Sequence, residues 1–292
     1  MATPLVELDR ITQIFKTRRG EVRAVDDVSL RLAPGEVVCL VGQSGSGKTT
    51  TARIAAGLTV PTSGTVRFEG VDLRGRDKET FGNFRRAVQY VHQDPYASLN
   101  PIRDVFGTMA APLRRHRRVG SRAEAWERAA ELLAQVGLTP PETYLEKYPH
   151  QLSGGQRQRV AVARALTLGP KVIIADESTS MLDVSIRMNL LTMLTGLRRD
   201  LGVGFLFITH DLAIAKNFGW EGKTAVMHQG KIVEYGATPQ VIGAPEHPYT
   251  QALIEAVPEP DPDLARRKRQ TRLSRTSVAA SADGRADAEG PP

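Results

Sequence analysis

The sequence predicts an α/β fold with a mainly parallel, doubly wound sheet, and three observations lead to that prediction. Short apolar runs typical of buried strands occur at residues 36–42, 171–176 and 203–210. Helical patterns at residues 156–168 and 185–201 precede the second and third of these runs. Strands that alternate with helices in this way indicate parallel crossover connections.

The first third of the chain contains further strand patterns around a glycine-rich loop. Residues 5–11, 22–32 and 65–69 alternate apolar and polar side chains, as half-buried strands do. The turn at residues 33–35 leads into the first buried run, and a helical segment at residues 48–58 follows the loop. We therefore expect one sheet that is buried on both faces and a second, half-exposed group of strands.

The middle and the end of the chain differ in composition. Residues 103–137 have a helical pattern, with an apolar face formed by Ala125, Ala129, Leu132, Leu133 and Val136. After Asp263 the chain is polar, charged and rich in Ala, Gly and Ser. Such a segment buries too little apolar surface to order itself, so residues 263–292 are predicted to be a disordered charged tail.

Length and composition exclude several classes of protein. A chain of 292 residues with 41% hydrophobic residues can bury a sizeable core in one large or two smaller domains. The single cysteine, Cys39, excludes an intramolecular disulfide and any four-cysteine metal or iron–sulfur cluster. No apolar run reaches the ~18 residues of a membrane span, and the first ten residues do not have the pattern of a signal peptide. We expect a soluble cytoplasmic protein.

The glycine-rich loop carries the first functional motif. Gly42-Gln-Ser-Gly-Ser-Gly-Lys48-Thr49 fits G-x-x-x-x-G-K-[ST] after a strand and at the start of a helix. Its backbone N–H groups and the helix N-terminus are expected to hold phosphates, Lys48 to reach the β- and γ-phosphates, and Thr49 to bind Mg²⁺. The predicted ATP-binding residues of this loop are Gly42, Ser44, Gly45, Ser46, Gly47, Lys48, Thr49 and Thr50.

A pair of carboxylates ends the second buried strand. Asp176 follows a run of apolar residues, and Glu177 comes next. A carboxylate beside a phosphate loop holds Mg²⁺, and its neighbour can orient or deprotonate the water that attacks the γ-phosphate. The alternative is that Asp176 and Glu177 are only a polar strand end with no catalytic role. The phosphate loop in the same chain argues against this alternative.

A third motif, Leu152-Ser-Gly-Gly-Gln-Arg-Gln-Arg159, resembles the signature of the ATP-binding cassette (ABC) ATPases. The resemblance implies a P-loop NTPase fold with a RecA-like core, an antiparallel β subdomain and a helical subdomain at about residues 95–165. It also implies head-to-tail pairs in which Ser153, Gly154, Gly155 and Gln156 cap the ATP bound by the partner cassette. A helix N-terminus with glycines is an anion site in any case, although Ser153 by itself is also an ordinary helix cap.

Four single residues extend the resemblance. By position in the family pattern, Gln93 is implied to contact Mg²⁺ and the attacking water, and His210 to sense the γ-phosphate. Asp183 is implied to cross the interface of the cassette pair, and Phe15 to stack on adenine. The chain departs from the family pattern at Ser178 and Met181, where proline and alanine are usual, and the catalytic groups are unaffected by these changes.

Two segments resemble the oligopeptide/dipeptide importer branch of the family, in particular its F-type member. They are residues 93–101 and residues 247–258, the latter beginning His247-Pro-Tyr. The resemblance implies an ATP-binding domain at residues 5–262, with an importer-type segment at about 240–260. It also implies a motor on the cytoplasmic face of the cell membrane, bound to two integral membrane permease subunits and served by an extracytoplasmic binding protein. The second ATPase would be a D-type subunit or a second copy of this chain, and the cargo peptides, oligosaccharides or nickel.

Other readings remain open at this point. The net charge of +7 includes basic clusters at residues 114–118 and 266–275, which a soluble ABC ATPase acting on ribosomes or DNA would use. We expect no nucleic-acid partner, because only one phosphate loop and no long coiled-coil insertion are present. An exporter subunit and a P-loop kinase are further alternatives.

We expect residues 94–112 to receive the permease coupling helix. The first basic cluster, residues 114–118, would then lie either near lipid headgroups or on a solvated helix face.

Overall fold

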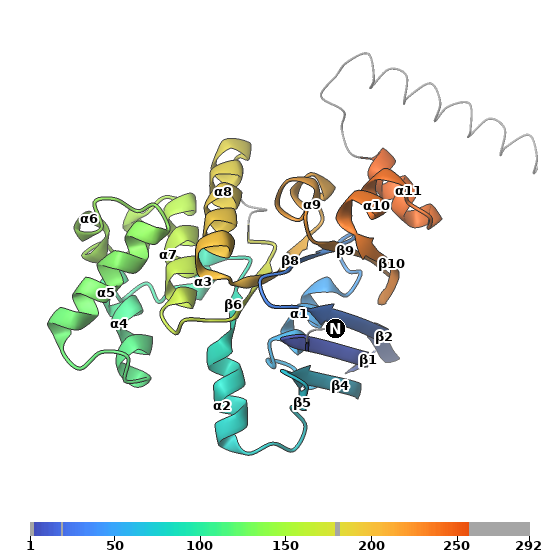
Figure 1. Ribbon diagram of the computed structural model, residues 1–292, viewed down its shortest axis with the longest axis horizontal. Helices are drawn as coiled ribbons and strands as arrows, with labels where there is room; N and C mark the ends of the chain where they lie inside the picture. Colours follow the sequence, from blue (N-terminus) through green and yellow to red (C-terminus); the bar gives the residue numbers. More distant parts are fainter. Residues whose placement is uncertain (1–2, 19, 179–181, 257–292) are drawn as a thin grey trace, which may run out of the picture.

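The computed structural model describes residues 3–18, 20–178 and 182–256, so the predicted tail at 263–292 lies outside the described residues. Within these ranges the chain forms two sheets and a lobe of helices (Figure 1). The predicted α/β fold is confirmed.

The larger sheet contains the buried strands predicted from the apolar runs. It consists of β3 (Val37–Val41), β6 (Val88–Val91), β7 (Val172–Asp176), β8 (Gly204–Thr209), β9 (Lys223–His228) and β10 (Lys231–Ala237). Their order across the sheet is β10-β9-β3-β8-β7-β6. Neighbouring strands are parallel except for the antiparallel hairpin of β9 and β10. The sequence did not predict β6, β9 or β10.

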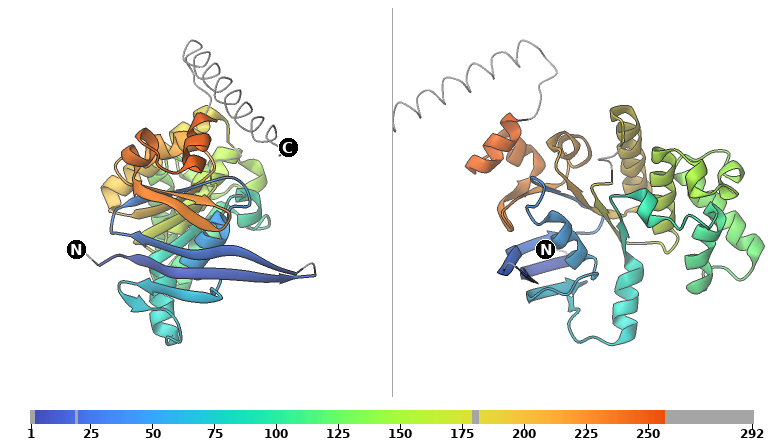
Figure 2. Two further views of the ribbon diagram at one scale, coloured as in Figure 1. Left: turned by 90° about the vertical axis from the view of Figure 1, so that its right-hand side faces the viewer. Right: turned by 180° about the vertical axis from the view of Figure 1, so that it is seen from behind.

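The smaller sheet is antiparallel, in the order β2-β1-β4-β5. Its strands are β1 (Val6–Thr17), β2 (Gly20–Leu32), β4 (Ser63–Phe68) and β5 (Val71–Asp72). β1 runs six residues past its predicted end at residue 11. Arg10 has a left-handed φ of 49°, and the pairing register shifts between Leu8 and Ile11. This irregularity interrupts the alternation of side chains without ending the strand. From the side, β1 and β2 form a long ribbon (Figure 2).

The larger sheet separates two hydrophobic cores. Val38 and Leu40 of β3 pack with the antiparallel sheet and with α1 (Lys48–Ala55). The alternate residues Val37, Cys39 and Val41 pack with helices on the opposite face. Cys39 is fully buried, and burial raises the pKa of its thiol to about 12, so it serves as a small core residue.

The segment between β6 and β7 forms a helical lobe, seen apart from the antiparallel sheet in Figure 1. Its helices are α3 (Pro95–Ser98), α4 (Val105–Arg115), α5 (Arg122–Gln135), α6 (Glu142–Leu145), the 3₁₀ helix η1 (Pro149–Gln151) and α7 (Gly154–Leu166). The helical pattern at residues 103–137 forms two helices, because Arg117 takes a left-handed φ of 52° beyond α4 and Ser121 caps α5.

The remaining helices surround the larger sheet. They are α2 (Lys78–Ala87), α8 (Val184–Leu201), α9 (Leu212–Phe218), α10 (Thr238–Gly243) and α11 (Pro248–Glu255). In Figure 2, α10 and α11 lie at the opposite end of the molecule from the helical lobe. Among the described residues, none of the helices combines the length and the apolar character needed to cross a membrane.

Candidate functional site

The fold brings four strand ends to one edge of the larger sheet. Because β3, β6, β7 and β8 are parallel, their carboxyl ends lie together. The register pairs Val41 with Thr209, Asp176 with Ile208 and Ala175 with Val91. The phosphate loop, Asp176 and Glu177, His210 and Gln93 therefore follow neighbouring strands, although the sequence separates them widely.

Two glycines fix the shape of the phosphate loop. A Cβ at Gly42 would lie 2.2 Å from the carbonyl oxygen of Met227, and one at Gly47 would lie 2.3 Å from that of Ala24. Both have positive φ, at 155° and 104°. Only glycine fits at either position, so the loop packs directly on the backbone of β9 and β2.

Gly45 and Ser46 are the parts of the loop that could accept a ligand. A Cβ at Gly45 would have no neighbour within 4 Å, so the backbone there is open. The buried hydroxyl of Ser46 has no hydrogen-bond partner among the described residues. Buried polar groups are normally satisfied, and a phosphate oxygen would satisfy this one.

Lys48 lies at the start of α1 with only 4% of its side chain exposed. Its Nζ donates hydrogen bonds to the carbonyl oxygens of Gly42 at 2.8 Å and Gln43 at 2.7 Å, and lies 3.9 Å from Oε1 of Glu177. Burial lowers the pKa of Lys48, while Glu177 and Asp176 oppose that shift. The ammonium is thus held in a partly desolvated position, where its attraction for phosphate is strong.

Asp176 is held from two sides. The Thr49 hydroxyl donates to its Oδ1 at 3.1 Å, and the Tyr90 hydroxyl donates to its Oδ2 at 2.6 Å. Burial and the nearby Asp176 raise the pKa of Tyr90, so its phenol remains a hydrogen-bond donor. Tyr90 was not among the residues predicted from the sequence; its place three residues before Gln93 is a signal that could have pointed to it.

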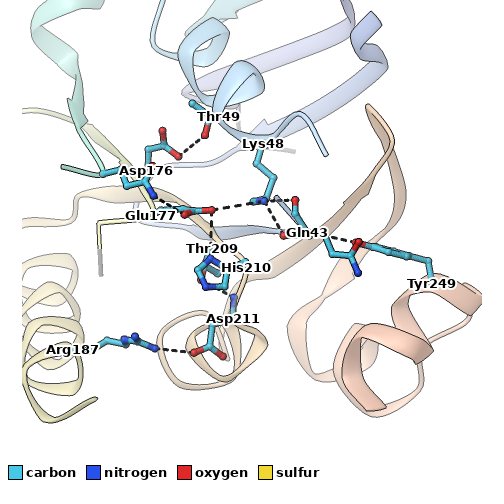
Figure 3. Close-up of polar contacts among 12 residues, drawn as sticks. Gln43, Lys48, Thr49, Asp176, Glu177, Arg187, Thr209, His210, Asp211 and Tyr249 are labelled. Atoms are coloured by element: carbon cyan, nitrogen blue, oxygen red, sulfur yellow. Dashed lines mark hydrogen bonds and ion pairs between the residues drawn. The ribbon is translucent and has the colours of Figure 1, made fainter. Parts of the chain in front are cut away.

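Glu177 is the centre of the cluster in Figure 3. Nε2 of Gln93 donates to its Oε2 at 3.0 Å. Nδ1 of His210 lies 3.5 Å from its Oε1 (Figure 3). The backbone of Glu177 has a left-handed φ of 42°, and its N–H donates to the carbonyl of Ile208. A positive φ in a glutamate is strained and is held in place by this bond to the neighbouring strand.

A residue near the end of the described chain also reaches the loop. The hydroxyl of Tyr249 in α11 accepts a hydrogen bond of 3.1 Å from the backbone N–H of Gln43 (Figure 3). In the sequence, Tyr249 stands out only as part of the segment that resembles the importer branch. Because the two residues lie 206 positions apart, no local pattern reveals this contact.

The signature segment has local hydrogen bonds. The Ser153 hydroxyl accepts from the backbone N–H of Gln156, and the Gln156 side chain accepts from the N–H of Ser153. This is a capping box, and α7 begins at Gly154, two residues earlier than the sequence suggested. A Cβ at Gly155 would lie 2.6 Å from the Ile186 side chain of α8, so that position requires close packing.

Two other predicted residues lie outside the central cluster. Asp183 is exposed and precedes α8 without capping it through its side chain. Phe15 lies on β1 opposite Val22, with 43% of its side chain exposed. Met181 falls outside the described residues. The structure therefore brings together the phosphate loop, Gln93, Asp176, Glu177 and His210, and presents Ser153 and Asp183 on separate helix starts.

Comparison with known families shows to which family the chain belongs. Residues 25–180 match the family described as ABC transporter. The chain belongs to this ABC transporter family. Residues 233–284 also match the family described as oligopeptide/dipeptide transporter, C-terminal region. The resemblance predicted from the sequence motifs is confirmed, including the importer branch.

Curated relatives agree with this assignment. The oligopeptide transport ATP-binding protein OppF of Bacillus subtilis is 42% identical over 269 residues, which cover 92% of this chain and 87% of that protein. The glutathione import ATP-binding protein GsiA of Pectobacterium atrosepticum is 42% identical over 276 residues, 92% of this chain and 43% of that protein.

Solved structures show the same fold. The ATP-binding cassette MJ0796, in a dimeric post-hydrolysis state bound to ADP and Pi, superposes with a TM-score of 0.72 and is 31% identical. The match covers 80% of this chain and 98% of that cassette. The ABC protein described here is accordingly an ATP-binding ATPase of the cassette fold.

Proposed function

We propose that this ABC protein is the ATP-hydrolysing subunit of a peptide importer, working from the cytoplasmic face of the cell membrane. The observation that carries the proposal is the position of Glu177, between Lys48, Gln93 and His210 at the mouth of the phosphate loop. Relatives named for oligopeptide and glutathione import support peptides as the cargo class, ahead of oligosaccharides or nickel.

The oxygen donors beside the loop fit Mg²⁺. Thr49 and Asp176 place a hydroxyl and a carboxylate 3.1 Å apart, and oxygen donors of this kind are the ligands that Mg²⁺ prefers. Gln93 donates to Glu177 through its amide nitrogen, which leaves its amide oxygen as an acceptor for a metal ion or water. Bound Mg²⁺ would neutralise charge on the phosphates.

The side chains around Glu177 suit an in-line attack of water on the γ-phosphorus. In this step the water oxygen forms the new bond, the bond to the bridging oxygen of ADP breaks, and Glu177 accepts the proton of the water. Gln93 holds the Glu177 carboxylate, and Lys48 supplies positive charge to the phosphate oxygens. His210, 3.5 Å from Glu177, is positioned to respond to the γ-phosphate.

Head-to-tail pairing of two cassettes would complete the site. Ser153 and the first N–H groups of α7 form an anion-binding helix start whose use by the same chain is redundant. Two exposed apolar side chains one turn apart follow Asp183 on α8, namely Val184 and Met188. An apolar patch at that place favours contact with another cassette, either a D-type subunit or a second copy of this chain.

The segment after Gln93 offers a surface for a permease. Tyr96 and Ile102 are 60% and 81% exposed. Ser98 and Asn100 of the same segment help to line a cavity of ≈ 420 Å³. The Arg157 guanidinium of α7 stacks 3.5 Å over the Tyr96 ring, and Arg164 of α7 donates to the carbonyl of Ser98. Movement of a permease helix bound here would thus reach the helix that begins with Ser153.

The partners follow from this arrangement. Two integral membrane permease subunits would bind through coupling helices, and an extracytoplasmic binding protein would deliver the peptide without touching this chain. ATP binding would close the cassette pair, and hydrolysis with phosphate release would reopen it. The similarity to import subunits favours this function over action on ribosomes or DNA.

The test uses Glu177→Gln, which keeps the size and polarity of the side chain but removes the base. We expect the variant to bind ATP while turnover falls by about 100-fold or more. A tagged variant, recovered with ATP and Mg²⁺ from detergent-solubilised native membranes, should retain two integral membrane subunits and a second ATPase.

The matched control is Glu127→Gln on the exposed face of α5. It should leave turnover unchanged, because Glu127 lies in the helical lobe outside the cluster. Ribosomes or DNA recovered with Glu177→Gln, in place of permease subunits, would overturn the importer assignment, and undiminished hydrolysis would exclude Glu177 as the base.

A further inference from the structure

The importer-type segment near the end of the described chain touches the nucleotide site directly. Tyr249 belongs to α11, and its hydroxyl accepts the backbone N–H of Gln43 in the phosphate loop at 3.1 Å (Figure 3). No step of the proposed hydrolysis involves this residue. The contact joins α11, near the end of the described chain, to the phosphate loop, which lies near its beginning.

The hydrogen bond falls on one particular peptide unit. The N–H of Gln43 and the carbonyl of Gly42 belong to the same planar amide. The oxygen of this amide accepts a hydrogen bond of 2.8 Å from the ammonium of Lys48, and its N–H donates one to the hydroxyl of Tyr249. Hydrogen bonds at both ends of an amide polarise each other and are mutually strengthened. Tyr249 therefore acts on the carbonyl that holds Lys48.

The phenol of Tyr249 is itself firmly placed. Its ring stacks on His228 at the end of β9, with ring centroids 3.9 Å apart and an angle of 27°. The backbone N–H of Tyr249 donates to Nδ1 of His247, which caps α11. Glu234 of β10 accepts from the backbone N–H groups of Glu246 and His247. The larger sheet thus anchors the start of α11 through two strands.

A Cβ at Gly42 would meet the backbone of Met227, the residue before His228. The loop therefore rests on the same end of β9 that supports the Tyr249 ring. This continuity makes the Tyr249 hydroxyl a fixed acceptor, whereas a water molecule in its place would be free to move.

We propose that Tyr249 is a positioning residue for Lys48: it fixes the amide between Gly42 and Gln43, and so holds the ammonium where it meets the phosphates of the incoming nucleotide. The inference rests on the proposed function of the phosphate loop and deepens it, because it gives the importer-type segment a part in nucleotide binding. Through Tyr249, a displacement of α11 changes the affinity of the loop for nucleotide.

The test compares two tyrosines in the same region of the full-length chain. Tyr249→Phe removes the hydroxyl but keeps the ring on His228. The matched control is Tyr235→Phe. The hydroxyl of Tyr235 donates to the carbonyl of Arg31 at 3.2 Å and does not contact the phosphate loop. Dissociation constants for ATP and ADP are measured by calorimetry in the presence of EDTA.

Tyr249→Phe should raise both dissociation constants about fivefold, the effect of losing one neutral hydrogen bond. The KM for ATP in steady-state hydrolysis should rise by a similar factor, while kcat stays within about twofold because bound triphosphate itself orders the loop. Tyr235→Phe should leave the affinities and KM unchanged.

Amide hydrogen exchange gives a readout that is independent of nucleotide. Without ligand, a peptide covering residues 42–49 should exchange faster in Tyr249→Phe than in wild type or Tyr235→Phe. His228→Ala keeps the hydroxyl but removes the support of the ring, so it should shift affinity in the same direction by a smaller factor.

Three results would overturn the inference: unchanged ATP affinity and loop exchange in Tyr249→Phe, equal changes in Tyr235→Phe, or a rise in exchange spread evenly over the chain. Wild-type protein that bound no ATP would contradict the proposed function instead. The two failures are therefore distinguishable.

Discussion

The phosphate-loop edge and the signature segment, the two halves of the ATP site that we propose, are built in different ways within one chain. At the phosphate-loop edge, which comprises residues 42–49, Gln93, Asp176, Glu177 and His210, side chains from four strand ends bond to one another. At the signature segment, residues 152–156, the hydrogen bonds close within three positions as a capping box. The first half is held by side-chain contacts between distant strands, whereas the side-chain hydrogen bonds of the second half are local to its own helix start.

The difference shows what each half can do without a partner. The phosphate-loop edge already holds Lys48, Asp176 and Glu177 in place, so a single cassette should bind nucleotide. The signature segment offers the N–H groups of a helix start, and we propose that another cassette supplies their ligand. Substitutions in either half test this difference, and we expect them to affect ATP affinity and hydrolysis differently.

Lys48→Ala should have the largest effect. The variant removes the buried ammonium, so ATP affinity should fall by about tenfold or more and turnover by about 100-fold, because the charge acts on both bound and reacting phosphate. Calorimetry with ATP and a phosphate-release assay measure the two quantities. Lys216→Ala, at an exposed position of α9, is the control and should match wild type. Unchanged affinity together with unchanged turnover would contradict the phosphate site.

Ser153→Asp should separate the two halves. Aspartate caps a helix as well as serine does, so α7 should keep its stability. Its negative charge would face the triphosphate of the partner cassette, and we expect hydrolysis by the assembled transporter to fall about tenfold or more. The affinity of a single cassette for ATP, measured by calorimetry, should not change.

The control for this variant is Ser121→Asp, since Ser121 caps α5 in the same way, accepting from the N–H of Glu124. It should leave both hydrolysis and ATP affinity intact. If Ser153→Asp weakened ATP binding by the single cassette, or if both variants slowed hydrolysis equally, the signature segment would not be an intermolecular site.

The sequence predicted the parts of the molecule that depend on local pattern. Buried strands such as β3 and β7 are nearly continuous apolar runs, and the phosphate loop has a fixed spacing between its glycines and Lys48. β6 was missed because Gln89 and Tyr90 interrupt a run of only four residues, and its burial comes from pairing with β7. Short strands defined by their neighbours leave little trace in sequence.

The contacts of the site were less predictable than its residues. Lys48 and Glu177 were identified by motif, whereas Tyr90 and Tyr249 hold the site through hydroxyl groups from β6 and α11. A tyrosine in a strand or a helix start is usually a packing residue, and only the fold shows where its hydroxyl ends. Sequence motifs thus identify the groups that we propose to touch nucleotide, and the structure adds the groups that hold them.

Tyr90→Phe tests such a supporting contact, and we expect the smallest effect of the three. The variant removes the donor to Oδ2 of Asp176 but leaves the bond from Thr49 to Oδ1. A carboxylate held on one side only should bind Mg²⁺ less well, so the Mg²⁺ concentration for half-maximal hydrolysis should rise about twofold to fivefold. ATP affinity in EDTA should stay unchanged, which separates this effect from that of Lys48→Ala. Tyr235→Phe again serves as the control; a shift in metal-free ATP affinity, or the same Mg²⁺ dependence as wild type, would show that Tyr90 only fills space beside Asp176.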